Sequence, residues 1–397
     1  MLGEIVGIPL PRELRLPKVK KLLAFKKANF RHRLNAGKRC DRITATAPED
    51  QRLLVLKHRD AYISYPVIEE LLRRVKQVIF TDPVRAEEMA RIALLIAEEL
   101  DPGLPHVASI TLCREFQARC HAHLGNVHRV LCQWKESEFH FKRAMDLLWK
   151  GIGDPMIHAE VQSLRGSFLT DRQRFDEAIN ALQESATLYQ ELGEQHQAGV
   201  VLLNMAAAYC RKGVPDQALP IHLKGVELVD EERNPVLTAA AWNNLARIYL
   251  FLGQFEAAES TLQSAPSFYD LFPQASSIHI NRTWTEGCVH AGLGRLSEAL
   301  DRLHEAFEGF RLRRDSYNAA LAQIDRMRVL LKQGQLREVE HSARLVLEML
   351  QAEPIAREAQ EALRLLLVAA SRRQLVESLV DQAAAVLREH PPAPRSH

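Results

Sequence analysis

The sequence has few aromatic residues, 6% of 397 positions, and almost no runs in which β-branched residues alternate with polar ones between turn residues. Runs of that kind are typical of β-strands, so we expect no sheet. Hydrophobic residues nevertheless make up 47%. Ala, Leu, Glu, Gln and Arg are abundant throughout, which is a helix-forming composition. The sequence therefore predicts an all-α protein.

Long apolar runs and cysteine motifs are also missing. No stretch of about 18 apolar residues occurs, so no transmembrane helix is expected. The first ten residues lack the charged start and apolar run of a signal peptide. None of the six cysteines forms a C-x-x-C pair, which in a chain of this length is typical of reduced thiols rather than of a disulfide framework. We expect a cytoplasmic protein.

The local motifs of common enzymes are absent as well. The sequence contains no G-x-S-x-G, no H-E-x-x-H, no phosphate-binding loop and no dinucleotide fingerprint. His58-Arg59-Asp60 is similar to the catalytic triplet of protein kinases, but the downstream Asn and the Gly-rich loop that this chemistry requires are missing. We predict no enzyme and no cofactor. A hydrolase or phosphatase whose catalytic pair is distant in sequence stays as an alternative.

One stretch, residues 234–266, carries a recognisable pattern. It begins with Asn234-Pro235, where an Asn side chain suits the cap of a helix and Pro its first position. The residues that follow fit the pattern W-x2-L-G-x2-Y, then A-x3-F, then P, with Ala in place of Gly and Leu in place of Phe. They are Trp242, Leu245, Ala246, Tyr249, Ala258, Leu262 and Pro266.

Four sets of positions recur at steps of 40 or 41 residues when this stretch is the reference. The small position of the first helix holds Gly125, Gly166, Ala206, Ala246, Gly287 and Met327. The turn position holds Cys132, Gln173, Gly213, Gly253, Gly294 and Gly334. Two positions of the second helix hold Ser137, Ala178, Ala218, Ala258, Ala299 and Val339, and Ala144, Ser185, Gly225, Ala265, Ala306 and Leu347. Small residues let helices approach closely, and a turn Gly supplies a positive φ.

Residues from about His106 to Gln351 therefore resemble tetratricopeptide repeats of the long-period kind. That kind occurs in MalT-like regulators, in bacterial peptide-sensing regulators and in some eukaryotic scaffolds. The resemblance implies a right-handed α-solenoid of helical hairpins, because one hairpin cannot bury its apolar face alone. It also implies that a peptide or protein partner binds in a concave groove, which makes a non-catalytic scaffold or adaptor our first functional expectation.

The expected organisation has five parts. Residues 1–46 are a basic N-terminal arm and linker, in which we expect a helix from about Lys18 to Leu34 and a linker from Thr44 to Gln51. Residues 47–105 hold N-terminal helices with a degenerate first repeat, where Ala86, Ala90 and Ala93 follow the repeat spacing. Residues 106–352 hold six repeats, residues 353–390 a pair of capping helices, and residues 391–397 a tail.

The resemblance also assigns the groove to fixed positions of each first helix, counted from the small residue. Arg, Asn and Trp at such positions suit peptides, because they offer forked donors, amides and a flat apolar surface. Ordinary solvated helix surface is the alternative. The groove residues so assigned are Arg119, Asn126, Arg129, Glu160, Ser163, Ser167, Thr170, Asp171, Asn204, Arg211, Asn243, Asn244, Arg247, Asn281, Trp284, Arg328 and Lys332.

The chaperone-binding carboxylate clamp known from this family does not map onto the chain. Its Lys and Asn positions in the first of the six repeats hold Ala122 and Asn126. Its Asn, Lys and Arg positions in the next unit hold Leu164, Asp171 and Phe175. Capture of a chaperone's C-terminal carboxylate is therefore not expected.

Charge is distributed unevenly. Residues 1–42 contain 12 Lys and Arg against three acidic residues, whereas the remaining chain has 40 against 47. Basic residues with interleaved Phe25 and Phe30 indicate nucleic acid or an anionic membrane surface as a partner; an arm that is solvated or folded onto the acidic body is the alternative. A regulator whose arm contacts nucleic acid while its repeats sense a partner is our second functional expectation. The residues concerned are Lys18, Lys20, Lys21, Lys26, Lys27, Arg31, Arg33, Lys38 and Arg39.

Cysteines and histidines are concentrated between Cys113 and Cys132. His121, His128 and Cys132 share one helix face at i, i+7 and i+11. Two metal ligands on one helix should stand three or four residues apart, and no C-x2-C or H-x3-H pair occurs. His121 and His128 also occupy the repeat positions of Trp242 and Tyr249, where large side chains pack. We therefore predict no metal site.

Overall fold

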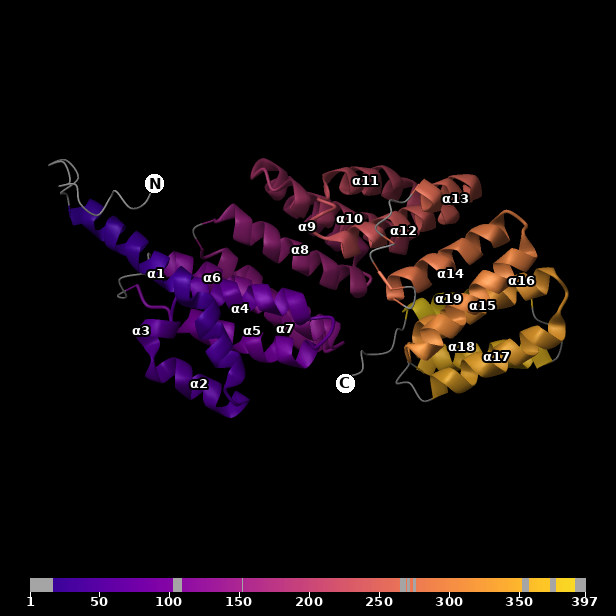
Figure 1. Cartoon of the computed structure of the whole chain (residues 1–397), viewed down its shortest axis with the longest axis horizontal. Helices are drawn as coiled ribbons and strands as arrows, with labels where there is room; N and C mark the ends of the chain where they lie inside the picture. The colour runs from indigo at the N-terminus through magenta and orange to yellow at the C-terminus, as the bar shows by residue number, and fades with distance from the viewer. Residues whose placement is uncertain are drawn as a thin grey trace. The chain divides into compact units, whose positions relative to one another are not determined.

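The computed structural model describes residues 17–102, 109–151, 153–264, 269, 272–273, 276–351, 357–371 and 376–389. The secondary structure of these residues is helical (Figure 1), which confirms the all-α prediction. They form two compact units, an N-terminal unit up to Arg172 and a C-terminal unit from Gln173. The tail at 391–397 and Ala265 lie outside the described residues. No helix in the described ranges is long and apolar enough to cross a membrane.

The N-terminal unit contains eight helices among its described residues. They are α1 (Pro17–Ala45), α2 (Pro48–Lys57), α3 (Arg59–Tyr62), α4 (Tyr65–Val78), α5 (Pro83–Glu98), α6 (Ile110–Val130), α7 (Trp134–Leu148) and α8 (Pro155–Asp171). α4 and α5 pack as a hairpin that continues into α6, and Ala86, Ala90 and Ala93 of α5 are fully buried.

Helix α1 is longer than expected, because it continues to Ala45 instead of ending near Leu34. Its second half packs on α4, with Ala36, Cys40 and Ile43 buried. α2 begins at Pro48, so the linker expected over 44–51 consists of Thr46 and Ala47 alone. The burial of an apolar face by α4 explains why the helix persists through a segment whose composition resembles a linker.

The C-terminal unit begins with α9 and ends with α19. Its helices are α9 (Phe175–Glu191), α10 (Gln195–Lys212), α11 (Pro215–Leu228), α12 (Pro235–Phe251), α13 (Phe255–Ser264), α14 (Ser277–Gly292), α15 (Leu296–Leu312), α16 (Ser316–Lys332), α17 (Leu336–Gln351), α18 (Arg357–Ser371) and α19 (Glu377–Glu389). Sequential helices pack as hairpins, and α14 also packs on α12 and on α16. This is the predicted α-solenoid of helical hairpins.

The turn positions predicted from the repeat all have a positive φ. Gly213, Gly253, Gly294 and Gly334 have φ between 70° and 85°. Cys132 and Gln173 also have positive φ, at 56° and 59°, although side chains with a Cβ disfavour this region. Asn234 caps α12 through a hydrogen bond from the Leu237 amide to its Oδ1, at 3.1 Å. The register read from residues 234–266 is therefore correct at the hairpin turns.

The small residues allow helices to approach backbone to backbone. A Cβ added at Gly199 of α10 would lie 2.8 Å from the carbonyl oxygen of Gly225 on α11, and one at Gly287 of α14 would lie 2.8 Å from Leu303 Cγ. Both distances are shorter than van der Waals contact. Ala206, Ala218, Ala246 and Ala258 are fully buried for the same reason.

One expected hairpin is divided between the units. Gly166 and Ser185 were assigned to the two helices of a single repeat, but the boundary between the units falls at Arg172 and Gln173, in its turn. α8 packs on α6 and α7, and α9 packs on α10. The turn at Gln173 has the positive φ of the repeat.

The last helix, α19, packs on the first helix of the sixth repeat as well as on α18. The Tyr317 hydroxyl of α16 donates to the Leu387 carbonyl at 3.1 Å. Arg328 of α16 donates to Asp381 of α19 at 2.6 Å. These contacts hold α19 against α16, which is the first helix of its hairpin. The candidate site lies along such first helices.

Candidate ligand-binding site

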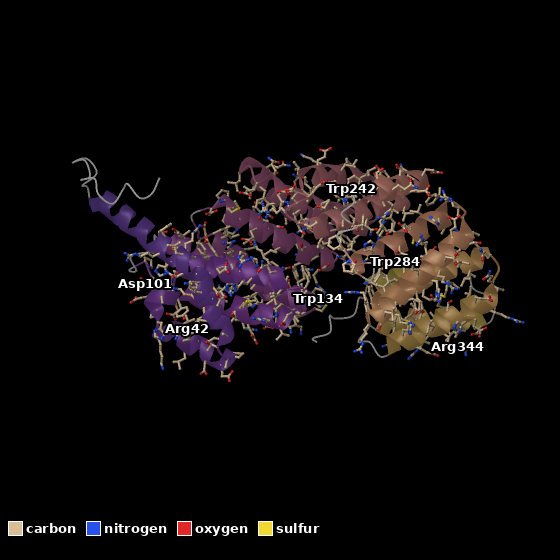
Figure 2. The ribbon with its side chains drawn as sticks, viewed as in Figure 1. Arg42, Asp101, Trp134, Trp242, Trp284 and Arg344 are labelled. Atoms are coloured by element: carbon tan, nitrogen blue, oxygen red, sulfur yellow. The ribbon has the colours of Figure 1, made fainter. Side chains whose placement is uncertain are left out.

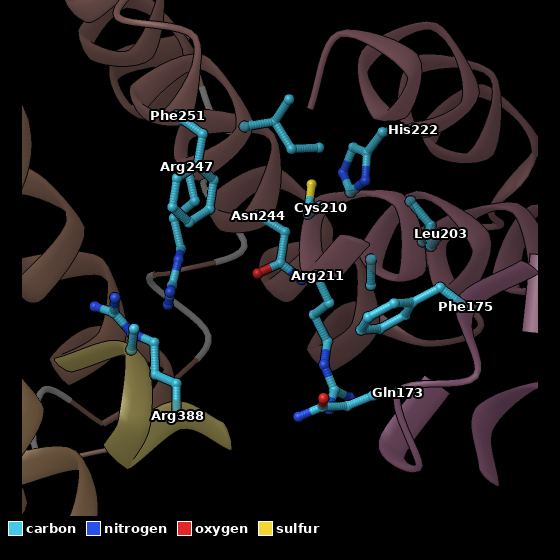
Figure 3. A pocket seen from close by; sticks show the side chains of 13 residues that line it. Gln173, Phe175, Leu203, Cys210, Arg211, His222, Asn244, Arg247, Phe251 and Arg388 are labelled. Atoms are coloured by element: carbon cyan, nitrogen blue, oxygen red, sulfur yellow. The ribbon is translucent and has the colours of Figure 1, made fainter. Parts of the chain in front are cut away.

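A cavity of about 680 Å³ lies within the C-terminal unit (Figure 3). Its walls come from the first helices α10 and α12, from α9 and α11, and from α19. The residues that matter for its chemistry are Phe175, Arg211, Asn244, Arg247, Phe251 and Arg388. An apolar cavity wall with a few polar groups is the usual form of a ligand site.

A second cavity of about 270 Å³ shares Arg247, Phe251 and Arg388 with the first. α14 and α16 complete its walls, through Trp284, Asp325 and Arg328 among others. The two cavities form one region, which we call the arginine cavity, along the first helices α10, α12, α14 and α16. Its lining includes four arginines and one carboxylate, so the region is strongly cationic.

Asp325 is the counter-ion for part of this charge. Its side chain is 9% exposed. Oδ2 accepts from Trp284 Nε1 at 2.8 Å, and Oδ1 pairs with Arg328 and lies 3.9 Å from Arg388 Nη2. Arg328 has a second partner in Asp381. Asp325 therefore connects α14 and α16 to the C-terminal helix α19.

Arg247 is held differently. Its guanidinium lies 5.4 Å from the centre of the Trp284 ring, a cation–π contact that orients it without neutralising it. Among the described residues it has no hydrogen bond and no ion pair. Burial lowers the pKa of Arg247 and so does the nearby Arg388, whereas Cys288 and Asp325 oppose this shift. Figure 3 shows Arg247 and Arg388 extending from α12 and α19 into the same part of the cavity. Arg247 is therefore a half-buried cation that no described carboxylate pairs with directly.

Five of the predicted groove residues line the arginine cavity. Arg211, Asn244 and Arg247 line its larger part, and Arg247, Trp284 and Arg328 its smaller part. Trp284, which is labelled in Figure 2, differs from the expectation of a flat apolar surface, because it is only 5% exposed and its indole contacts the Arg247 guanidinium. Its ring also meets Phe310 edge-on, with centroids 5.7 Å apart. Trp284 therefore contacts both Arg247 and Phe310 at the wall of the smaller part of the cavity.

Residues 197–267 match the sequence model of the tetratricopeptide repeat family. The chain carries tetratricopeptide repeats. This confirms the resemblance read from residues 234–266. The match covers α10 to α13, which contribute much of the larger part of the arginine cavity. A comparison with curated protein sequences finds no match.

Solved structures with the same repeat fold are similar to this chain at low identity. The complex of NprR with its cognate peptide NprX has a TM-score of 0.55 at 15% identity, over 81% of this chain and 88% of the other. The apo form of RapI has a TM-score of 0.54 at 13% identity, over 72% and 97%. A Rap protein complexed with competence and sporulation factor has 0.52 at 11% identity, over 93% and 100%. These comparisons support the fold.

The predicted groove residues of the N-terminal unit are engaged with one another. Arg119 of α6 pairs with Glu160 of α8 at 2.5 Å. Arg129 Nη1 pairs with Asp171 at 2.6 Å, and its Nε donates to Asn126 at 2.9 Å. Ser163 is half-buried. The charges assigned to the groove here link neighbouring first helices instead of forming an open ionic surface.

The remaining predicted groove residues of the repeats do not line the arginine cavity. Asn243 is 7% exposed, and its Oδ1 is buried without a hydrogen-bond partner. Asn281 donates to the Ser277 carbonyl on its own helix, Asn204 is half-buried, and Lys332 lies 3.7 Å from Glu377 of α19.

Repeat register accounts for some cavity residues that sequence reasoning missed. Asp325 stands two positions before the small residue Met327, the same position that selected Asn204 and Asn244, so this signal was present. Phe175 and Phe251 flank hairpin turns. Arg388 lies on α19, outside the repeat columns, and only the packing of α19 on α16 brings it to the cavity.

The basic residues expected to contact nucleic acid lie on α1. The side chains of Lys18, Lys20, Lys21, Lys26 and Lys27 lie outside what the structure describes. Arg31 is exposed, Arg33 pairs with Glu69 of α4 at 3.1 Å, and Arg39 lies 2.7 Å from His32 Nδ1. Lys38, Arg39 and Arg42 line a surface hollow of about 480 Å³ together with His58 and Tyr62.

Three histidines in the first of the six repeats pack together. His121 Nδ1 lies 2.8 Å from His140 Nδ1, and the His128 and His140 rings stack at 5.2 Å. No group of three or more His, Cys, Asp or Glu in the described ranges has the geometry of a metal site. Burial lowers the pKa of His121 to about 4 and that of His140 to about 3, with neighbouring cationic groups adding to the effect.

These pKa values predict that the N-terminal unit loses stability in mild acid. Both folded-state values lie below the unfolded value of about 6.5, so the unfolded chain takes up protons first as the pH falls below 6.5. We expect the free energy of unfolding to fall by roughly 2 kcal/mol between pH 7 and 5.5. Urea titrations followed by circular dichroism measure it. A His121→Gln, His140→Gln variant should show a clearly smaller decrease; an equal decrease would exclude the histidines as its cause.

Proposed function

We propose that the chain is a non-catalytic binding protein that holds a peptide or an extended protein segment in the arginine cavity. The observation that carries the proposal is the position of this cavity: four successive first helices, α10, α12, α14 and α16, contribute to one continuous region. A stack of repeats creates such an elongated surface, whereas a single hairpin offers none.

The chemistry of the walls fits a peptide. Phe175 and Phe251 offer apolar surface, and the exposed amide of Asn244 suits the backbone of an extended chain. Arginines add forked donors for carbonyl or carboxylate oxygens. Two solved structures of similar fold, NprR and a Rap protein, are complexes with a peptide and with a factor respectively, which supports the same kind of ligand here.

The test is a steric block. Peptides that bind the full chain are selected from a displayed random library, and their dissociation constants are measured by fluorescence anisotropy. Ala207 is exposed on α10 and lines the cavity, so Ala207→Trp should fill it and weaken binding at least about tenfold. Gln217→Trp, at an exposed position of α11, is the matched control. Equal affinity of the Ala207→Trp and unmodified chains would refute the proposal.

A second candidate function is nucleic-acid binding by α1. The basic hollow formed by Lys38, Arg39 and Arg42 favours it, because clustered cations attract phosphates. It predicts that a labelled 20-base-pair DNA or a labelled RNA binds with a steep salt dependence that a Lys38→Glu, Arg42→Glu variant removes. If binding is absent at low salt, or is the same in the variant, α1 has no such role.

A further inference from the structure

The arginine cavity contains a more specific site than a general peptide groove. The Arg247 guanidinium contacts the indole of Trp284, and among the described residues it forms no ion pair, although Asp325 acts on it electrostatically from a greater distance. A partly desolvated charge without a direct ion pair is costly, so a ligand that supplies an anion gains more here than at an exposed arginine. The neighbouring Arg388 has only a distant pairing with Asp325, at 3.9 Å, and retains donors for a second partner.

We propose that a carboxylate of the bound peptide docks between Arg247 of α12 and Arg388 of α19. The inference rests on the proposed function, since the peptide must occupy the arginine cavity. The carboxylate belongs to the C-terminus of the peptide or to an Asp or Glu side chain, two sources with the same chemistry. This pair of arginines lies at positions distinct from those of the chaperone-type carboxylate clamp, which hold Ala122, Asn126, Leu164, Asp171 and Phe175 in this chain.

The charge balance favours a single negative charge. Asp325 and Asp381 neutralise Arg328 and part of Arg388, and Arg211 has contacts of its own within the chain. Arg247 forms no ion pair among the described residues, and Arg388 is only partly neutralised. One carboxylate neutralises Arg247, and its two oxygens match the fork of a guanidinium.

The site also makes α19 part of the binding surface. Arg388 is located one turn after Ala385, which lines the same cavity, and α19 is held against α16 by Asp381 and by the Leu387 carbonyl. A carboxylate between Arg247 and Arg388 links α12 to α19. Binding is therefore expected to hold α19 more firmly on the first helices.

The experiment uses the library-selected peptides and the full chain. Each peptide is prepared with a free C-terminus, with a C-terminal amide, and with each Asp or Glu replaced by Asn or Gln. We expect one of these neutralisations to weaken binding at least about tenfold, which identifies the source of the carboxylate. In Arg247→Gln and in Arg388→Gln the same neutralisation should weaken binding less than about twofold. A double-mutant cycle gives this result when the neutralised carboxylate and the replaced arginine interact in the unmodified complex.

A second measurement reports on α19 and does not depend on the variants folding perfectly. Amide hydrogen exchange over residues 377–389 should slow when the unmodified chain binds the carboxylate peptide and change less with the neutralised one. Arg247→Lys, which keeps the charge, should retain part of the coupling.

The outcomes separate the two proposals. If Ala207→Trp blocks the peptides but every neutralisation leaves their affinity unchanged, the carboxylate site is wrong and the cavity is still the binding region. Peptides unaffected by Ala207→Trp would overturn the proposed function itself.

Discussion

A Glu160→Ala variant is expected to lose about 3–5 kcal/mol of the free energy of unfolding of the N-terminal unit. Glu160 of α8 is 6% exposed and contacts three basic side chains: Lys76 of α4, and Arg119 and His123 of α6. Burial raises its pKa, but Arg119, Lys76 and His123 together lower it well below the ordinary value. Removing the carboxylate leaves buried positive charge without a partner, which costs more than the pairing itself contributes.

Urea unfolding at pH 7 checks this expectation. Glu138→Gln is the matched control, because Glu138 pairs with Lys142 at 3.3 Å and both side chains are largely exposed; such pairs contribute under about 1 kcal/mol. Glu160→Gln, which keeps the shape and a carbonyl acceptor, should lie between the two. If Glu160→Ala unfolds at the same urea concentration as Glu138→Gln, the cluster does not stabilise the unit.

The second large effect is expected at Asp325. Asp325→Ala removes the acceptor of Trp284 Nε1 and the shared counter-ion of Arg328 and Arg388. We expect the C-terminal unit to be destabilised by about 3 kcal/mol, since a buried acceptor and a buried negative charge are lost together. The loss should be concentrated at α19, because the remaining tie of Arg328 to α19 is Asp381, which is 56% exposed.

Hydrogen exchange across residues 316–332 and 377–389 measures where the loss falls. Exchange in α19 should accelerate by at least about tenfold in Asp325→Ala. Asp381→Ala removes the exposed end of the same network and should accelerate it only slightly. Unchanged protection of α19 in Asp325→Ala would show that Asp325 does not hold this helix.

The hairpins were predictable because their requirements are local. A small residue at a helix crossing and a positive φ at a turn depend on a few neighbouring positions. The spacing from Ala246 and Gly253 was therefore enough to locate six turns, including those at Cys132 and Gln173. The length of α1 depends on which of its surfaces becomes buried against α4. This burial is not a property of the local residues, so the pattern did not predict it.

The candidate site shows the same division. Arg211, Asn244, Arg247 and Arg328 could be predicted to share a surface, because position within a repeat determines which way the first helix of a hairpin presents a side chain. The register does not state whether a charge is already paired, so Arg119 and Arg129 were selected equally, although Glu160 and Asp171 neutralise them. Arg388 lies outside the repeats, so the repeat register could not select it. Only the packing of α19 on α16 brings it to the cavity.

The position of α19 has a consequence for biosynthesis. α10 and α12 leave the ribosome long before α19 does, so Arg247 is made without the helix that faces it. A nascent chain that ends before residue 377 has the repeats but an incomplete arginine cavity, and domains fold from the N-terminus as they are synthesised. If the proposed function holds, ligand binding waits until α19 has emerged, and a ribosome stalled within α18 carries a chain whose cavity is open on the side that Arg388 later lines.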